Sequence, residues 1–597
     1  MILLKKLFIQ MSKAINREEL IKLYEEIGLN VLDNNTVMNS SNKKICNFLV
    51  NIIEQRVIDG KMYLCINAMG INGELLSEVI LDSNTINRTT WVIENWGFKY
   101  SIDKKYINDF IELIQHLCMN IKTKYIYDHT GWIYQDNKWI YLHGGGVIGG
   151  SDVQVELDES IDNYILPDKI SDINKACEMS LKLVDLIEDD KGIIFSSLVY
   201  LSPLIEIISR KIKPPENIVW TYGKTGSRKT AVSKVVLSHF GDFNKKIPAT
   251  FNDTITAIEL KANKLKDSLY LCDDFAPKQD FRDKKIQDSK AESIIRMYGD
   301  RVGKGRSSNK LDIKDAKRPR GMILITGEDV ICGESSNARL LSIELNRSSV
   351  DLNILTELQN NSHLLGEAMR GYIEWLLSEM GNIDELSNIL LYNFKSYRDE
   401  IREQYKDDIH GRTIESSAWI LVGFSCMLNY IRDKGVIDKY EDDEYMDRAI
   451  KVVERLIEEQ IKLISRNSPI DIFLNTLKES INSKSIRIAT LNDQNQVIED
   501  KLEYICGYKD KEYYYFYTDK VYSFIEFENK KRGIHLGISQ RQLVKQLRDS
   551  GIVKVDSNND SPKKTIHTKD ASDSTGYTTI RPRMLQIERS IIENFQI

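Results

Sequence analysis

The chain has 597 residues, too many for a single hydrophobic core, so several domains are expected. Its 42% hydrophobic and 28% charged residues are typical of globular proteins and exclude wholesale disorder. A formal net charge of -6 excludes a histone-like coat for nucleic acid, and eight cysteines without a CxxC pair argue against a disulfide framework and a zinc ribbon.

The first part of the chain is predicted to form two units. Residues 1–40 have helical spacing followed by an Asn-rich loop, which predicts a small helical segment. Residues 41–170 alternate short apolar runs with Gly and Asn turns around one helical stretch, 106–118, and this pattern predicts an α+β N-terminal domain. Two lysines interrupt the apolar residues at the N-terminus, so no secretory signal is expected and a cytoplasmic location fits.

The middle of the chain is predicted to be an α/β domain followed by helices. Helices and apolar strands alternate over residues 171–350, which predicts a mainly parallel sheet covered by helices. The most apolar stretch, 193–208, contains Pro203 and Glu206 and is too short to span a bilayer, so we expect a buried helix and no membrane partner. Residues 351–485 contain long amphipathic runs without a convincing strand and are predicted to form a helical lid.

The last segment, residues 486–597, changes character again. An aromatic run, 513–517, reads as a strand that packs in a core or at an edge, with base stacking as the alternative. A helix over 539–550 is followed by two strand candidates, 552–556 and 578–587. Because a helix followed by a two-stranded wing is the order of a winged helix, we predict a C-terminal winged-helix domain.

A glycine loop follows the apolar strand predicted over 218–222 and opens a helix, which is the setting of a phosphate-binding loop. Its lysine can reach the β and γ phosphates of ATP, and the hydroxyl after it can ligate Mg²⁺. The motif departs from GxxxxGK[ST] because Arg228 stands at the usual second glycine, and a glycine turn with surface lysines is the alternative. The residues predicted to bind the cofactor are Gly223, Thr225, Gly226, Ser227, Arg228, Lys229 and Thr230.

Two further strands end in side chains suited to phosphate chemistry. The strand predicted over 269–274 ends in Asp273, which is suited to hold Mg²⁺, and Asp274, which is suited to orient the attacking water. The next strand ends at Thr326, predicted to sense the γ phosphate. For the two carboxylates, the alternative is an ordinary strand followed by an acidic turn. ATP and Mg²⁺ are therefore the expected cofactors.

Arg339 immediately precedes the last predicted strand of this unit, 340–345. From this position an arginine can reach the phosphate bound to a neighbouring subunit, as an arginine finger does, and a surface ion pair is the alternative. The order of these features predicts an AAA+ P-loop ATPase core within a multidomain α/β fold. The features are the glycine loop, the two carboxylates, the threonine and the arginine.

A basic insertion lies between the carboxylates and the sensing threonine. Residues 296–320 carry nine Lys or Arg against three Asp, and their centre, 298–307, is predicted to be a glycine-kinked hairpin. Lys304 and Arg306 are expected at its tip, in contact with DNA phosphates, with a solvated basic loop as the alternative.

A second basic surface is predicted on the helix of the winged-helix domain. Arg541, Lys545 and Arg548 are spaced by four and three residues and form one face. This face could meet DNA, although winged helices also dock proteins.

The sequence as a whole resembles a family of helicases. Gly131-Trp132, the run 139–150 and the ATPase elements above resemble the MCM-like AAA+ helicases of phages and integrative elements, in particular the Cch-type helicases of staphylococcal cassette chromosome elements. The resemblance covers residues 45–590 in element order and is most specific over 217–345. It implies a hexameric ring in which the basic hairpin lines the channel.

The resemblance also implies further roles. Arg412, at the start of a lid helix over 413–433, corresponds to a sensor 2 arginine that binds the nucleotide, with Arg370 as the alternative and helix-surface pairing as the plain interpretation of both. The implied function is ATP-driven movement on single-stranded and forked DNA during replication of a mobile element, with a primase or origin-binding protein as a further partner. A nucleotide-switched initiator or regulator that does not unwind DNA is one alternative, and an AAA+ machine acting on protein is another.

Overall fold

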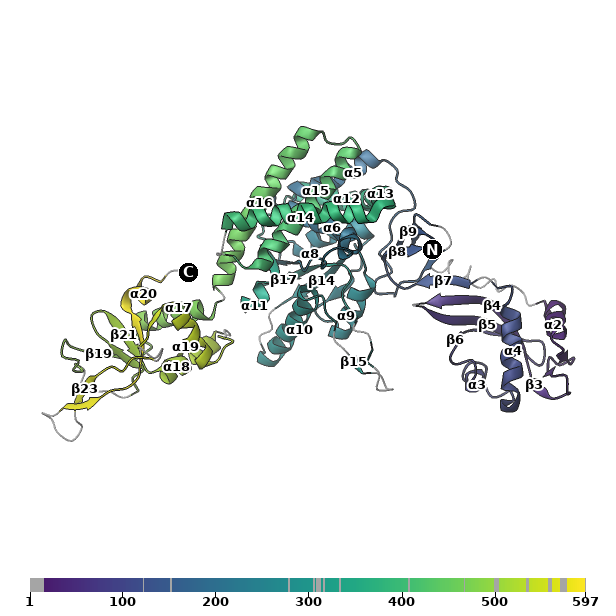
Figure 1. The fold of residues 1–597 in the computed structure, drawn as a ribbon, viewed down its shortest axis with the longest axis horizontal. Coiled ribbons are helices and arrows are strands. Elements are labelled where there is room, and N and C mark those ends of the chain that lie inside the picture. Colours follow the sequence, from purple (N-terminus) through teal and green to yellow (C-terminus); the bar gives the residue numbers. More distant parts are fainter. Residues whose placement is uncertain are drawn as a thin grey trace.

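The structure is a computed structural model that describes residues 16–595, except positions 59, 122, 151–152, 277–279, 304–305, 308–312, 315–316, 332–333, 406–408, 467, 499–503, 533–535, 557–560 and 570–576. Three bodies follow one another along the chain (Figure 1). The middle body contains the largest hydrophobic core, and the bodies on either side of it have cores of their own.

The N-terminal body combines a mixed sheet with helices. The sheet has the order β11-β7-β4-β5-β6 and consists of β4 (Leu49–Ile58), β5 (Lys61–Met69), β6 (Leu75–Asp82), β7 (Thr123–Tyr127) and β11 (Val153–Val155). The smaller elements are α2 (Arg17–Glu26), α3 (Thr90–Trp96), α4 (Ile107–Cys118) and a three-stranded sheet of β1 (Asn30–Val31), β2 (Val37–Met38) and β3 (Lys44–Cys46).

The first described helix belongs to this body. Leu20 and Tyr24 of α2 lie in its core, and the Tyr24 hydroxyl donates a hydrogen bond to the Val50 carbonyl oxygen at 2.8 Å. Residues 16–40 therefore share a core with the N-terminal domain instead of forming the separate segment expected for residues 1–40. Helical periodicity predicts the helix, but it does not say which core the apolar face covers.

The boundary at residue 170 also differs from the structure. A small sheet of β8 (Gly131–Gln135), β9 (Lys138–His143) and β10 (Gly146–Ile148) packs in the middle body. The buried Trp132 donates its indole N–H to the Pro203 carbonyl oxygen at 2.7 Å and its backbone N–H to the Asp267 carboxylate at 2.9 Å. Of the strands beyond residue 128, only β11 among those described returns to the N-terminal sheet.

The middle body is built on a parallel sheet, as the alternation of helices and strands predicts. Its order is β13-β14-β17-β12-β18, and every described pairing in it is parallel. The strands are β12 (Ile218–Tyr222), β13 (Ala249–Thr250), β14 (Leu269–Phe275), β17 (Met322–Gly327) and β18 (Leu340–Glu344). Because the carboxyl ends of parallel strands meet at one edge, the loops after β12, β14 and β17 lie next to one another.

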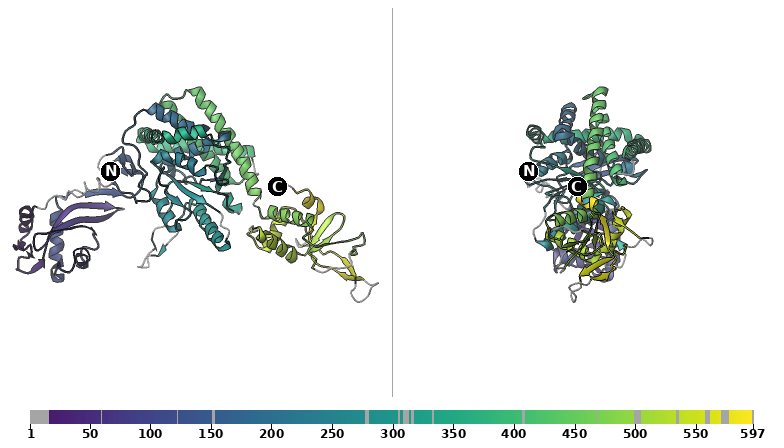
Figure 2. Two further views of the ribbon diagram at one scale, coloured as in Figure 1. Left: turned by 180° about the vertical axis from the view of Figure 1, so that it is seen from behind. Right: turned by 90° about the vertical axis from the view of Figure 1, so that its left-hand side faces the viewer.

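Helices surround this sheet (Figure 1, Figure 2). Those along its own part of the chain include α5 (Ile173–Leu181), α6 (Gly192–Leu201), α7 (Ile205–Ser209), α8 (Lys229–Leu237), α9 (Ile255–Lys264) and α10 (Phe281–Gly299). The region after β18 contributes α12 (Leu352–Asn360), α13 (Ser362–Glu379), α14 (Ile383–Tyr405), α15 (Gly411–Asp433) and α16 (Lys439–Arg466). In the view of Figure 1 this second group lies above the sheet.

The helical region does not form a separate lid. Its buried residues belong to the same hydrophobic core as the sheet, so the predicted division at residue 350 crosses one continuous core. Two segments, Glu188–Ser209 and Gly411–Asp433, are long and apolar enough to cross a membrane, but 89% and 78% of their apolar windows are buried inside the protein. These segments include α6 and α15, which pack against each other, so the apolar composition of both segments reflects burial in this core. The sequence predicts this burial for the segment that contains α6.

The C-terminal body combines a five-stranded sheet with helices. The sheet has the order β19-β20-β21-β25-β22, with β19 (Ile488–Thr490), β20 (Gly507–Lys509), β21 (Tyr513–Phe516), β22 (Val553–Lys554) and β25 (Leu585–Glu588). The other elements are α17 (Pro469–Asn482), α18 (Thr518–Lys531), α19 (Gln540–Asp549), α20 (Arg589–Glu593) and a hairpin of β23 (Ile566–Lys569) and β24 (Tyr577–Ile580).

Two expectations for this body need correction. The strand predicted over 578–587 is two strands that pair with different partners, separated by a segment that contains Pro582, a residue unable to donate to a ladder. The core of this body also includes Phe473 and Leu477 of α17, so the body begins before residue 486. Tyr514 and Phe516 are buried in it, which supports packing over base stacking for the aromatic run.

The junction between β8 and β14 provides a test of the central core. Gly131 has φ +94°, and a Cβ placed there would lie 2.5 Å from the Lys266 carbonyl oxygen. Gly131→Ala should therefore destabilise the middle body by about 2–4 kcal/mol, because left-handed strain and a clash with backbone add together.

The matched control is Gly146→Ala. This glycine also has a positive φ, +136°, but a Cβ there would meet nothing within 4 Å. It should cost less than Gly131→Ala, about 1–3 kcal/mol, because only the backbone strain remains. Urea unfolding, followed by tryptophan fluorescence, compares the two variants. Equal urea midpoints for Gly131→Ala and Gly146→Ala would contradict the predicted clash at Gly131.

Candidate functional site

The glycine loop connects the carboxyl end of β12 with the first turn of α8. Gly223 and Gly226 have φ values of +152° and +88°, and Ser227 is buried within the turn. Arg228 caps α8 with φ +66°, in the left-handed region. A non-glycine residue in that region costs on the order of 1–3 kcal/mol, which explains why glycine is usual at this position. The first N–H groups of α8 have no partner within the helix, so the loop is suited to bind an anion.

Lys229 folds back over this loop. Its Nζ donates to the carbonyl oxygens of Gly223 at 2.5 Å and Lys224 at 3.2 Å, and lies 3.3 Å from the Ser227 hydroxyl. Partial burial lowers the pKa of Lys229 from its ordinary value, and nearby carboxylates, Glu328 first among them, act in the opposite direction. The ammonium group thus lies at the centre of the loop, held by neutral oxygens that a phosphate could replace.

Asp273 connects the loop to the two neighbouring strands. Its side chain is buried and accepts hydrogen bonds from the Thr230 hydroxyl, at 3.1 and 3.2 Å from its two oxygens, and from the Thr326 hydroxyl. The three predicted residues therefore lie in direct contact. This is possible because β17 runs between β12 and β14, which puts the end of β17 between the glycine loop and the carboxylate.

Asp274 differs from Asp273 in conformation and exposure. The register of β14 against β17 shifts between Cys272 and Phe275, and Asp274 lies in this irregularity with φ +70°. Its backbone N–H donates to the Thr326 hydroxyl at 3.1 Å, while its side chain is exposed. A bulge of this kind redirects a side chain away from the strand direction, so the second carboxylate faces solvent beside the buried first one.

Sequence reasoning missed two charged residues at the glycine loop. The Thr225 hydroxyl donates to Glu328 at 2.5 Å, and Arg347 donates to the Thr225 carbonyl oxygen at 3.4 Å. Glu328 follows Thr326 by two residues and Arg347 follows β18 by three, and these positions after strand ends are the signal that could have identified both.

Arg339 and Arg412 lie together at the opposite edge of the sheet. Both guanidinium groups contact Asp300, at 3.5 and 3.0 Å, and Arg412 is also 4.0 Å from Glu216. Glu216 precedes β12, so this cluster is at the amino end of a strand whose carboxyl end holds the glycine loop. Arg412 therefore does not lie at the glycine loop of its own chain, and its sensor 2 role stays a prediction.

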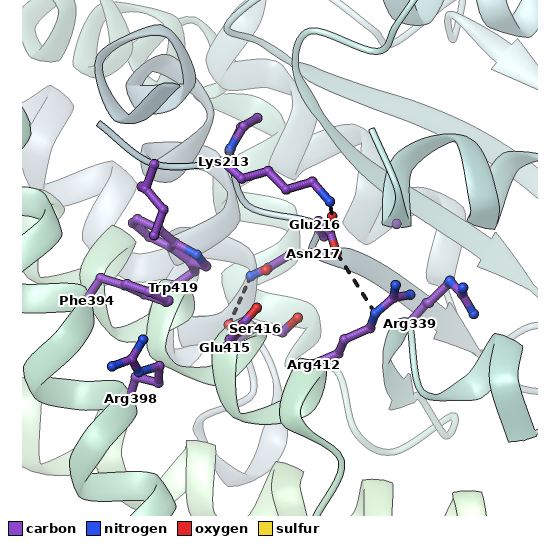
Figure 3. Close-up of a pocket in the computed structure, with 13 residues that line it drawn as sticks. Lys213, Glu216, Asn217, Arg339, Phe394, Arg398, Arg412, Glu415, Ser416 and Trp419 are labelled. Carbon is purple, nitrogen blue, oxygen red and sulfur yellow. Dashed lines mark hydrogen bonds and ion pairs between the residues drawn. The ribbon is translucent and has the colours of Figure 1, made fainter. Parts of the chain in front are cut away.

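The two arginines line a cavity of about 280 Å³ (Figure 3). Its opposite wall includes the stacked rings of Phe394 and Trp419, whose centroids are 4.2 Å apart. The alternative candidate, Arg370, instead pairs with Glu374 at 2.8 Å and donates to a backbone oxygen at 2.7 Å. It has the helix-surface role that the sequence allowed.

The basic insertion is a hairpin, but its centre is not where the glycines suggest. Residues 298 and 299 end α10, and Tyr298 is fully buried. Arg301 is buried as well and donates to the Pro215 and Gly321 carbonyl oxygens, so it anchors the base of the insertion. The paired strands are β15 (Arg306–Ser307) and β16 (Ile313–Lys314).

The structure describes the two predicted tip residues only in part. Lys304 lies outside the described residues, and of Arg306 only the backbone, in β15, is described. On α19 of the C-terminal body, Arg541 and Lys545 are exposed and Arg548 is half-buried, while Leu543 and Leu547 face the core. The basic face of α19 is thus directed away from that core.

The arrangement at the glycine loop is chemically suited to one class of ligand. Backbone N–H groups and an ammonium favour an anion, and a hydroxyl in contact with a carboxylate can supply oxygen ligands to a small divalent cation. A second, exposed carboxylate beside them could accept a proton or orient water. A phosphoanhydride with a bound metal ion combines these requirements.

No family model matches the chain, and no curated protein matches it. Its fold matches a solved structure titled "SCCmec type IV Cch - active helicase", with a TM-score of 0.58 and 14% identity over 95% of this chain and 99% of that chain. A ligand-bound structure of the JCV helicase is matched over 38% of this chain and 65% of that chain, with 12% identity and a TM-score of 0.23, too low to support an inference. The chain has the fold of the Cch helicase, which confirms the resemblance at the level of fold.

Thr326 and Thr221 provide a matched pair of substitutions at this site. They are register partners on β17 and β12, and both are buried. The Thr326 hydroxyl contacts Asp273 and the Asp274 backbone, whereas the Thr221 hydroxyl has no hydrogen-bond partner among the described residues. Thr326→Val should lower nucleotide hydrolysis by about 100-fold, and Thr221→Val should leave it within about twofold. A phosphate-release assay measures both, and a similar rate in the two variants would contradict the assignment of Thr326.

Proposed function

We propose that the protein is an ATP-dependent DNA helicase of the AAA+ type. The observation that carries the proposal is the contact of Asp273 with both Thr230 and Thr326 beneath the glycine loop. This is the arrangement that hydrolysis of a metal-bound nucleoside triphosphate requires. The fold shared with the Cch helicase supports the same conclusion.

The proposed roles follow from position. Lys229 and the loop N–H groups bind the phosphates, and Thr230 and Asp273 would hold Mg²⁺, which when bound neutralises charge on the phosphate oxygens. Asp274 accepts the proton of the attacking water or orients that water from its exposed position. Thr326 links the Asp273 carboxylate to the Asp274 backbone, since its hydroxyl donates to the former and accepts from the N–H of the latter.

The arginine cluster supports an active site shared between subunits. Arg339 and Arg412 lie at the edge of the sheet opposite to their own glycine loop, so we assign them to a nucleotide held by another copy. We propose that Asp300 holds both guanidinium groups ready for the phosphates of the neighbour. Repeating this contact around a ring gives a closed oligomer, for which we propose a hexamer.

The DNA-binding roles are proposed from charge and position. The hairpin of β15 and β16 extends from the base of the middle body beside α9 and α10 (Figure 1), and we assign its basic residues, including Lys304 and Arg306, to phosphates of single-stranded DNA. We assign the basic face of α19 to DNA as the second contact, in a C-terminal winged helix. A cytoplasmic replication helicase of a mobile element, working with a primase or origin-binding protein, is the proposed setting.

The Lys229→Ala variant tests the motor function directly. Removing the ammonium should lower ATP hydrolysis to background and abolish strand displacement on a forked DNA, while urea unfolding of the protein stays unchanged because Lys229 contacts only loop oxygens. DNA-stimulated hydrolysis by the unmodified protein without strand displacement would favour the initiator or regulator, and hydrolysis indifferent to DNA would favour a machine that acts on protein.

Mixed oligomers test the shared active site. Lys229→Ala and Arg339→Ala subunits should each be inactive alone, but mixing them should restore part of the hydrolysis, because some interfaces then pair an intact loop with an intact arginine. Mixing Lys229→Ala with Asp273→Ala should restore nothing, since every site is then defective in cis. Restoration in neither mixture would contradict the assignment of Arg339 to the neighbouring site.

A further inference from the structure

The segment that follows β18 runs along the glycine loop. The Leu345 N–H donates to the Tyr222 carbonyl oxygen at 2.8 Å, and a Cβ placed on Gly223 would lie 2.1 Å from the Leu345 carbonyl oxygen. The glycine is thus required not only by the turn but also by the close approach of this second segment. The glycine loop and the segment after β18 are therefore held in one fixed arrangement at the carboxyl edge of the sheet.

Arg347 extends from this segment over the loop. Its guanidinium Nη2 donates to the Thr225 carbonyl oxygen at 3.4 Å, and its guanidinium atoms lie 3.4–3.7 Å from the position of a Cβ on Gly226. Arg228 fixes the backbone beneath it, since Arg228 Nη1 donates to the Arg347 carbonyl oxygen at 2.9 Å. The side chain that replaces the usual glycine of the motif is therefore used to hold a second arginine in place.

The charge of Arg347 is not neutralised where it lies. The residue is exposed, and within the described part of the chain its guanidinium donates to a backbone oxygen of Thr225, while its carbonyl oxygen accepts from the guanidinium of Arg228. A cation that hydrogen-bonds only to a neutral oxygen at the rim of an anion-binding loop retains its full attraction for a phosphate. Arginine also offers several N–H donors in a planar fork that matches phosphate oxygens.

The order of the strands gives the orientation of a bound nucleotide. Asp273 and Thr326, which attract the metal and the terminal phosphate, lie at the ends of β14 and β17. The strand β18 lies on the other side of β12, so the phosphates nearer the nucleoside must run from the glycine loop towards the segment after β18. A cavity of about 340 Å³ opens there, and its lining combines neutral residues, among them Tyr222, Asn346 and Ser349, with four carboxylates and two lysines. Arg347 follows Asn346 of this lining, and its guanidinium lies over the glycine loop at Thr225 and Gly226.

We propose that Arg347 is a nucleotide-binding residue that contacts the α and β phosphates of the nucleotide held by its own subunit, and that Arg228 positions it. The inference rests on the proposed ATPase function and goes beyond it. It supplies from the same chain the arginine that Arg412, at the opposite edge of the sheet, cannot provide. The contact is made to phosphates that ATP and ADP share, so it governs retention of the nucleotide both before and after hydrolysis.

Calorimetric titration of the full-length protein with MgADP and with MgATP tests the proposal. Arg347→Ala should lower the affinity for both nucleotides by the same factor, about tenfold, because the lost contact is to phosphates that both contain. Arg347→Lys should recover part of this loss, because the charge remains while the planar fork of donors is lost. Arg402→Ala, an exposed arginine on α14, is the matched control and should change neither affinity.

Three outcomes overturn the proposal. The first is unchanged MgADP affinity in Arg347→Ala, and the second is a loss confined to MgATP. The third is a fall in the melting temperature of nucleotide-free Arg347→Ala with no recovery of affinity in Arg347→Lys, which would make Arg347 a support for the loop. Failure of the ATPase proposal itself is distinguished by Lys229→Ala, which would then bind MgADP as tightly as the unmodified protein.

Discussion

The buried carboxylate of Asp273 is the point on which the site depends. It contacts a hydroxyl from the glycine loop and a hydroxyl from β17, so three segments far apart in the sequence are joined at one side chain. A carboxylate this deeply buried is tolerated only when its oxygens are satisfied, and here hydroxyl donors satisfy them. The parallel register of β12, β17 and β14 produces this arrangement, because it brings all three strand ends to the same edge.

The two edges of the central sheet carry complementary halves of the proposed active site. The carboxyl edge holds the glycine loop, the two carboxylates and Arg347, whereas the amino edge holds Arg339 and Arg412 beside Asp300. In the proposed function, a single copy binds the nucleotide with the groups at its carboxyl edge and keeps two of its arginines out of reach of that nucleotide. This separation is the structural reason for expecting the protein to work as a ring.

Sequence alone predicted the local elements and missed how they are grouped. The strand before the glycine loop, the strand ending in Asp273 and the strand ending at Thr326 follow from apolar runs and need no tertiary information. The placement of Trp132 in the middle body and of α17 in the C-terminal body depends on contacts between distant segments, which periodicity does not encode. The predicted hairpin centre is wrong for a similar reason, because the sequence does not distinguish the glycine that ends α10 from a glycine in a turn.

A density map of the protein with a non-hydrolysable ATP analogue, Mg²⁺ and forked DNA tests the central claim most directly. The account predicts phosphates against the loop from Gly223 to Thr230, a metal ion between Thr230 and Asp273, and Arg339 of an adjacent subunit facing the terminal phosphate. Two results would contradict the account. One is a nucleotide bound elsewhere, and the other is Lys229 still hydrogen-bonded to the Gly223 and Lys224 carbonyl oxygens at saturating nucleotide.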